Sequence, residues 1–283
     1  MMSVIQRYSD LTIGTIGIIL SSFLFSWFGS LFDSTPFVKN GIQLLLPCAL
    51  FVLAYWFHKK YSGFNLTPSI GSKNRLRHAF ILGGTIGFSI SGVAFVCAYA
   101  LGYISHPLLL TSPGKLLSTI LTQAVVGSYE EIIFRGLLFL GLLIRSKNLF
   151  ISAFLSAVLF SLIHFQSYSL THHWYTHLGI VSIGMVLGYI YFITKSLWAP
   201  IALHFANNFF GHILIWQDIP ININNYTFTD LTQSSLNIFV CLLFSVFLYK
   251  NREKYSVESF LSPTPSIGEK NDLSIEEQSI IKS

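Results

Sequence analysis

The sequence predicts an all-α fold: a polytopic membrane protein built as a bundle of about eight transmembrane helices. Hydrophobic residues make up 52% of its 283 residues, charged residues make up only 10%, and the mean hydropathy is +0.61. A globular domain carries about 25% charged residues, so a soluble chain and a disordered chain are both excluded. The apolar residues also fall in runs near the roughly 20 residues that a helix needs to cross a bilayer.

Eight stretches qualify, or nearly qualify, as membrane spans. The first follows Arg7 and is too long for the apolar region of a cleaved signal peptide, so we interpret it as a retained span. The composition turns polar after Tyr249, which predicts a transmembrane domain over 1–250 and a disordered cytoplasmic tail over 251–283. In chain order the predicted spans cover residues 11–32, 41–57, 79–101, 116–144, 149–165, 178–194, 197–216 and 236–249.

The basic residues support this arrangement independently. With the N terminus inside, only Lys39 and Lys115 of the 17 Lys and Arg residues fall in outer segments, and Arg135 lies within a span. This asymmetry follows the positive-inside rule, so we expect both termini in the cytoplasm and, in a bacterium, an integral protein of the plasma (inner) membrane. The basic residues form short clusters without a continuous basic face, which excludes nucleic acid as a partner and leaves membrane lipid as the surroundings.

Small residues give two further expectations. The pairs Gly83 with Gly87 and Gly184 with Gly188 each lie four apart on one helical face, which predicts close packing of helices at these positions. The three cysteines all lie in apolar runs without C-x-x-C spacing, so neither a disulfide framework nor a thiolate zinc site is expected.

The fourth span contains the densest group of charged residues within the apolar runs. Ionisable groups cost at least about 2.5–3.5 kcal/mol each at the bilayer centre and mark functional sites by default. Glu131 and Arg135 lie four apart on one face and are expected to pair. Glu130 points about 100° away, and a carboxyl without such a partner in a low-dielectric site suits a general base. The alternative is that both glutamates only bind Arg135 and a neighbouring helix.

Two other spans supply companions for this group. His164 closes the fifth span, while His204 and Asn208 share one face of the seventh and could present donors to one atom. From the inner ends of their spans, Glu130 lies at about 22 Å and His204 at about 14 Å for a rise of 1.5 Å per residue. The side chains can therefore meet only if the helices tilt or the seventh span begins deeper.

These residues resemble the motifs of a known family. Glu130-Glu131-x-x-x-Arg135, Phe160-x-x-x-His164 and His204-x-x-x-Asn208 are similar, in this order, to the three motifs of the CPBP membrane proteases. That group contains the type II CAAX prenyl endopeptidases and the Abi bacteriocin-immunity proteins. The resemblance covers about residues 75–215 and leaves no motif position altered.

The resemblance implies a hydrolase that cleaves peptide bonds in a peptide or protein substrate, with a prenylated C terminus as one candidate. It implies that Glu130 and His164 activate a water molecule, that His204 and Asn208 stabilise the oxyanion, and that Glu131 and Arg135 organise the site. We expect no cofactor. Zinc held by Glu130, His164 and His204 remains the alternative, although the H-E-x-x-H signature of zinc proteases is absent from the sequence.

Other interpretations stay open. Buried Glu, His and Arg also mark ion pathways, but the inverted repeats of a transporter are not evident in the sequence. A non-catalytic immunity or scaffold protein of the same fold is the second rival. His172, His173 and His177 form another group after the fifth span; we interpret it as interfacial anchoring, with a metal clip at His173 and His177 as the alternative.

Overall fold

The computed structural model describes residues 72–102, 113–164, 174–210 and 223–261, with four isolated positions at 49, 52, 53 and 56. Within these ranges every regular element is a helix, which confirms the all-α prediction for them. Of these helices, three have a stretch that is long and apolar enough to cross a membrane: Leu76–Ala100, Trp174–Thr194 and Leu231–Lys250. The predicted spans at 11–32 and 41–57 lie outside the described ranges except for the isolated positions, so the count of eight stays a prediction.

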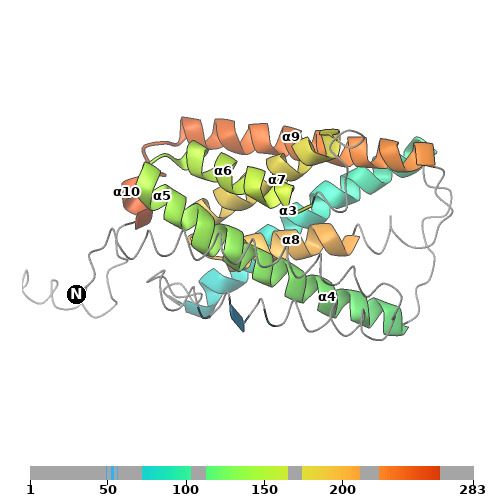
Figure 1. Ribbon diagram of the computed structural model, residues 1–283, viewed down its shortest axis with the longest axis horizontal. Helices are drawn as coiled ribbons and strands as arrows, with labels where there is room; N and C mark the ends of the chain where they lie inside the picture. Colours follow the sequence, from blue (N-terminus) through green and yellow to red (C-terminus); the bar gives the residue numbers. More distant parts are fainter. Residues whose placement is uncertain are drawn as a thin grey trace, which may run out of the picture.

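The described helices pack into one bundle. Figure 1 shows α9 along one long side and α4 along the opposite side, with α8 between them in this view. The elements are α3 (Ser72–Ala100), α4 (Pro113–Glu131), the π-helix η2 (Ile132–Phe139), α5 (Leu140–Ser146), α6 (Leu149–Leu162), α7 (Trp174–Thr194), α8 (Trp198–Phe210), α9 (Ile223–Lys250) and α10 (Val257–Leu261).

The close packing expected at the two glycine pairs is confirmed. A Cβ atom at Gly83 or Gly87 of α3 would collide with backbone carbonyls of α8. A Cβ atom at Gly184 of α7 would lie 2.9 Å from the Cβ of Ala157 in α6, and one at Gly188 would touch the Phe139 ring at 3.4 Å. The glycines therefore let α3 approach α8, and α7 approach α6 and η2, more closely than any side chain would allow.

The predicted span at 116–144 is a single run of helix with a change in its hydrogen bonding. α4 begins at Pro113, which is well accommodated in the first turn of a helix. The run passes through η2, where all eight residues are buried, and continues as α5 until Lys147 adopts a left-handed conformation with φ 52°. Asn148 then caps α6, because its Oδ1 accepts a hydrogen bond from the Ile151 N–H at 3.0 Å.

Four helices begin earlier than hydropathy predicts, α3 at Ser72 instead of 79 and α4 at Pro113 instead of 116 among them. α7 begins at Trp174 instead of 178 and therefore includes His177. α9 begins at Ile223 instead of 236. It carries Gln233 and Asn237 near its middle, and their amide groups are hydrogen-bonded inside the bundle. Polar residues that interrupt a hydropathy plot thus lie within a continuous helix.

The last candidate span ends at Lys250, but the first part of the tail predicted to be disordered has a described structure. Residues 251–256 turn back toward the bundle and lead into α10, in which the Phe260 side chain is 2% exposed. Its ring stacks on Phe192 at 5.0 Å and meets Tyr191 edge-on at 5.7 Å, while the Lys195 Nζ donates to the Ser259 carbonyl at 2.6 Å. The Phe260 ring, the Lys195 hydrogen bond and the Tyr255 ring, which packs on Phe247, together hold this segment against the bundle. Residues 262–283 lie outside the described ranges.

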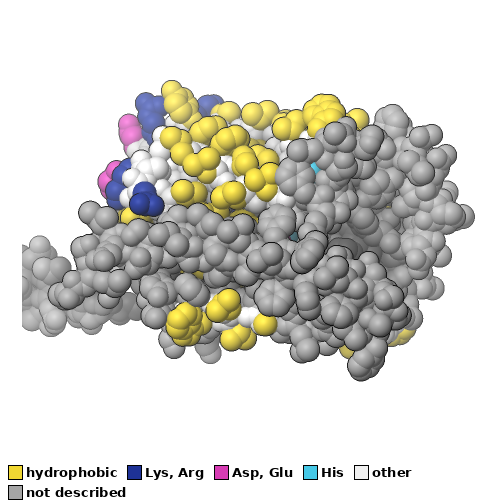
Figure 2. Space-filling model, in the orientation of Figure 1, with side chains coloured by type: hydrophobic (Ala, Val, Ile, Leu, Met, Phe, Trp, Pro, Cys, Tyr) yellow, Lys and Arg dark blue, Asp and Glu magenta, His cyan; other side chains and the backbone are white. Residues whose placement is uncertain are grey.

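Charged and apolar side chains separate on the surface. Hydrophobic side chains cover the visible part of the described helices, and Lys, Arg, Asp and Glu gather at the end where α5 and α10 lie (Figures 1 and 2). The exposed basic residues there are Arg145, Lys147, Lys195, Lys250, Arg252 and Lys254. All of them belong to segments that the charge pattern places on one side of the membrane.

Candidate active site

The Glu131 and Arg135 side chains form the fully buried centre of the site. The Arg135 Nη1 donates to the Glu131 Oε1 at 2.8 Å, and the two side chains are 1% and 0% exposed, which confirms the pairing predicted from their spacing. The Arg135 Nη2 donates to the Gly184 carbonyl of α7 at 3.1 Å, and the guanidinium lies over the Phe160 ring, 4.6 Å from its centre. Arg135 thus joins η2 to α6 and α7.

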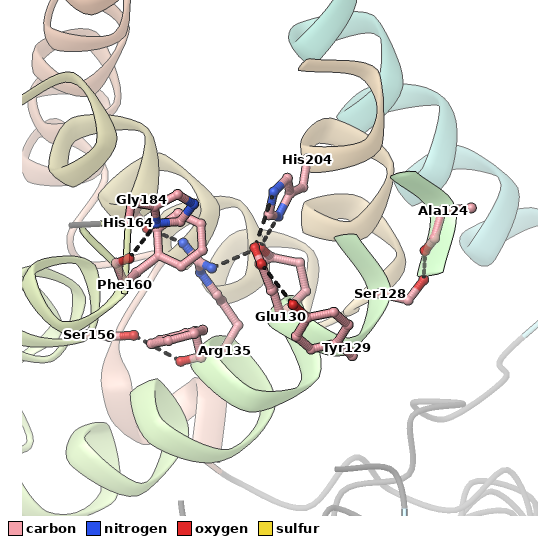
Figure 3. A network of polar contacts seen from close by, with 12 residues as sticks. Ala124, Ser128, Tyr129, Glu130, Arg135, Ser156, Phe160, His164, Gly184 and His204 are labelled. Atoms are coloured by element: carbon pink, nitrogen blue, oxygen red, sulfur yellow. Dashed lines mark hydrogen bonds and ion pairs between the residues drawn. The ribbon is translucent and has the colours of Figure 1, made fainter. Parts of the chain in front are cut away.

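Glu130 lies beside this pair with different neighbours. The Tyr129 hydroxyl donates to its Oε1 at 3.2 Å, and the Nε2 of His204 lies 3.5 Å from its Oε2. Glu130 is 6% exposed, so water reaches it only in a restricted way. As predicted from the helical period, Arg135 binds Glu131, while Glu130 faces a histidine from another helix (Figure 3).

The hydrogen bonds of His204 determine which ring nitrogen is available. Its Nδ1 lies 2.7 Å from the Glu131 Oε1, which also accepts from Arg135. An ionised carboxylate only accepts hydrogen bonds, so the Nδ1 carries the proton that it donates to Glu131. The Nε2 is then the nitrogen that faces Glu130, 3.5 Å from its Oε2.

His164 is oriented in the same manner at the end of α6. Its Nδ1 lies 2.9 Å from the Phe160 carbonyl, which can only accept, so the Nδ1 is the donor and the neutral ring exposes an accepting Nε2. The Phe160 ring meets both histidines edge-on, with centre distances of 5.0 Å to His164 and 5.7 Å to His204. One aromatic ring therefore separates and orients the two imidazoles and also lies under Arg135.

The structure brings the predicted site residues together to different degrees. Glu130, Glu131, Arg135 and His204 are in direct contact, and His164 joins them through the Phe160 ring. Asn208 lies one turn beyond His204 on α8 and is half-buried, and no hydrogen bond joins it to another part of the described chain.

Several contributors were not predicted as parts of the site. The Tyr129 hydroxyl and the Gly184 carbonyl each bind a charged group, yet the sequence indicated Gly184 only as a packing residue. The signal that could have found Tyr129 is its place directly before Glu130 in an apolar run. The Phe160 ring could have been suspected from its motif position, but its contacts depend on three helices.

The second histidine group was predicted to be an interfacial anchor, and the one member that the structure describes, His177, does not fit that prediction. His177 is 6% exposed and its Nδ1 lies 2.9 Å from the Ser161 hydroxyl of α6, so it is a buried helix contact and not an interfacial anchor. His172 and His173 lie outside the described ranges. Among the side chains that the structure describes, no group of three or more His, Cys, Asp or Glu is arranged to hold a metal ion.

The segment that builds the site is similar to a known protein family. Residues 112–210, which carry all three motifs, match the family model described as type II CAAX prenyl endopeptidase Rce1-like. The resemblance predicted from the motifs is confirmed over this segment. It is consistent with the CPBP family and, with the apolar helices, supports a membrane protein.

A curated relative agrees with this result. The Bacillus subtilis (strain 168) protein named "Putative membrane peptidase YdiL" is 32% identical to this chain over 120 residues, which is 42% of this chain. The aligned part spans 44% of that relative, less than half of its length. The match to the family model, at residues 112–210, includes α8 and ends before α9 and α10.

Proposed function

We propose that this protein is an intramembrane endopeptidase that hydrolyses peptide bonds with a water molecule activated by Glu130 and His164. The observation that carries the proposal is the direct contact of Glu130 with His204, two motif residues from separate helices, in a buried site. Matching of this same segment to an endopeptidase family supports it. Peptide segments within or at the membrane are the proposed substrates, with prenylated C termini as one class.

In the proposed reaction the Glu130 carboxylate takes a proton from water while the water oxygen attacks the carbonyl carbon of the peptide bond. The accepting Nε2 of His164 holds the same water in place, because its Nδ1 is engaged with the Phe160 carbonyl. The carbonyl π electrons move onto the oxygen and create an oxyanion. A positioned acid or base of this kind contributes about 10²–10⁴-fold to the rate.

His204 and Asn208 are proposed to receive the oxyanion. The Nδ1 of His204 already donates to Glu131, so the proposed donation from Nε2 uses the doubly protonated ring. Each such donor contributes about 10²–10³-fold in a water-poor site. When the tetrahedral intermediate collapses, the C–N bond breaks and the departing nitrogen takes the proton held on Glu130.

Glu131 and Arg135 are proposed to hold the reacting groups without touching the substrate. Glu131 fixes the His204 ring through Nδ1, and Arg135 compensates the buried charge of Glu131. We also propose that the basic end of the bundle faces the cytoplasm and that the reaction needs no metal. The metal-free form is supported by the absence of an H-E-x-x-H sequence from the chain.

The decisive experiment compares membranes that contain the unaltered protein with membranes that contain Glu130→Ala. New peptide N termini are captured and identified by mass spectrometry, with farnesylated and unmodified synthetic peptides as added probes. Glu258→Ala serves as the matched control, since Glu258 is an exposed carboxylate on α10. We expect cleavage with the unaltered protein and the control only; equal cleavage by Glu130→Ala at normal expression would refute the mechanism.

Two further outcomes would favour the rival functions. Absence of cleavage by every variant would favour a non-catalytic immunity or scaffold protein. Proton flux into vesicles that depends on Glu130 would favour a transporter, because buried acidic residues also carry ions.

A further inference from the structure

Uncharged polar side chains form a second cluster, separate from the charged residues of the candidate site, in which two members are buried and two, Asn207 and Gln233, are half-buried. The Oδ1 of Asn207 on α8 accepts from the Ser91 hydroxyl of α3 at 2.9 Å and from the Gln233 Nε2 of α9 at 3.3 Å. The Gln233 Nε2 also lies 3.2 Å from the Asn237 Oδ1. We call Ser91, Asn207, Gln233 and Asn237 the amide cluster. It links three helices through one accepting oxygen on α8.

The amide cluster is anchored to a fourth helix. The Asn237 Nδ2 donates to the Gly179 carbonyl of α7 at 3.3 Å. At this point α7 and α9 are in close contact, because a Cβ atom at Gly179 would lie 2.7 Å from the Cβ of Ser234. Ser91 and Asn237 are 2% and 5% exposed. The cluster therefore connects α8 to α3 through Ser91 and to α9 through Gln233, and it connects α9 to α7 through Asn237.

The closest approaches of α8 to α3 and α4 are made at glycines. Toward α3 it meets Gly83 and Gly87, and toward α4 it meets Gly127. Side-chain contacts between these helices include the edge-on Phe88 and Phe209 rings at 6.5 Å and the bond from His204 to Glu131 at 2.7 Å. Glycine contacts permit close approach but specify angle poorly, whereas hydrogen bonds in an apolar medium are directional. The Asn207 Oδ1 accepts two such bonds, one from α3 and one from α9.

We propose that the amide cluster sets the rotation of α8 and that Asn207 is thereby a positioning residue for His204 and Asn208. From the helical period, His204 lies about 60° and Asn208 about 100° around the axis from Asn207. A rotation of 20° moves an atom about 5 Å from the axis by roughly 1.7 Å. A displacement near 1 Å in a catalytic group costs about 10²-fold in rate. The consequence for catalysis rests on the proposed function, but the rotation itself does not.

Cysteine cross-linking measures the rotation without any substrate. An ideal Cβ at Gly127 would lie 3.8 Å from the Cβ of His204, which is within the range of disulfide-bonded cysteines. The pair Gly127→Cys and His204→Cys is therefore expected to form a disulfide in membranes treated with copper phenanthroline. Adding Asn207→Leu, which keeps the size but removes the acceptor, should remove most of the product. The background carries alanine in place of Cys48, Cys97 and Cys241.

Two variants separate rotation from general loss of stability. Asn207→Asp keeps the oxygen that accepts from Ser91 and Gln233, and should restore the disulfide. Ser245→Ala removes a hydroxyl from α9 that bonds to the Cys241 carbonyl at 2.9 Å and not to α8, so it should leave cross-linking unchanged. Equal cross-linking with leucine and asparagine at position 207 would overturn the proposal. An equal loss in Ser245→Ala would also overturn it, because the effect would then be nonspecific.

Kinetics on an otherwise unaltered chain give the second test. The probe is a quenched-fluorescent peptide with a cleavage sequence recovered from the membranes described above. Asn207→Leu should lower kcat about 10²-fold with little change in KM, and Asn207→Asp should recover most of kcat. A change in KM alone would overturn the positioning role. Failure of the unaltered protein to cleave any peptide would refute the proposed function while the cross-linking result still decides the rotation.

Discussion

The coupling between the buried ion pair and His204 leads to a test that separates stability from catalysis. In Glu131→Leu the Arg135 guanidinium, 1% exposed, loses the carboxylate 2.8 Å away and keeps its contacts with the Gly184 carbonyl and the Phe160 ring. Removing one partner of a buried ion pair costs about 3–5 kcal/mol. For a domain of this size that loss corresponds to a drop of roughly 6–20 °C in Tm. The double variant Glu131→Leu with Arg135→Leu leaves no uncompensated charge and should recover most of the Tm.

The two variants, Glu131→Leu and the double variant, should differ in stability but should both lose activity. Both variants leave the Nδ1 of His204 without the Glu131 oxygen at 2.7 Å, so the ring loses its fixed orientation in both. We expect peptide cleavage to stay at least about 10-fold below that of the unaltered protein even where stability returns. Tm is measured by intrinsic fluorescence in detergent, and cleavage is measured on the same preparations. The reasoning is wrong if the double variant is as unstable as Glu131→Leu, or if it regains full activity.

Three more predictions concern other parts of the molecule. Gly83→Ala should lower Tm by the equivalent of about 1–3 kcal/mol because its Cβ meets the Ala199 carbonyl, whereas Gly84→Ala, with open space around it, should not lower Tm. Phe260→Ala should release α10, detected as faster cleavage of residues 251–261 by added trypsin, while Glu258→Ala at an exposed site leaves the rate unchanged. Treatment with 1,10-phenanthroline should leave peptide cleavage intact; a loss restored by zinc would favour the zinc-dependent form.

Hydropathy predicted most of the helices, but not their interruptions or ends. The run at 116–144 reads as one apolar helix, and its π-helical segment is invisible because it depends on how Ile132–Phe139 packs against α6 and α7. The Ser156 hydroxyl of α6, for example, donates to the Phe134 carbonyl within that segment at 2.8 Å. The start of α9 was missed for a related reason. A hydropathy scale treats Gln233, which precedes the predicted start at 236, as exposed to lipid, whereas its amide binds Asn207 of α8.

Spacing within one helix predicted contacts better than spacing between helices. The Glu131–Arg135 pair follows from four residues of separation and needs no tertiary information. Depth counted along each helix separated Glu130 and His204 by about 8 Å, from a rise of 1.5 Å per residue, yet their side chains lie 3.5 Å apart. The count assumes helices parallel to a common axis. The glycine contacts of α8, which bring it against α3 and α4, are tertiary facts that the sequence indicates only in part.

The charge of the site explains how two adjacent glutamates suit the proposed reaction. Glu131 is paired with Arg135. The proposed reaction uses Glu130 as a carboxylate beside a doubly protonated His204, so that the four side chains together carry no net charge. In the proposed reaction the proton of water moves to Glu130 as negative charge appears on the oxyanion beside His204. Charge is thus transferred over a few ångströms and never added to the low-dielectric interior, which avoids the large cost of burying an unpaired ion.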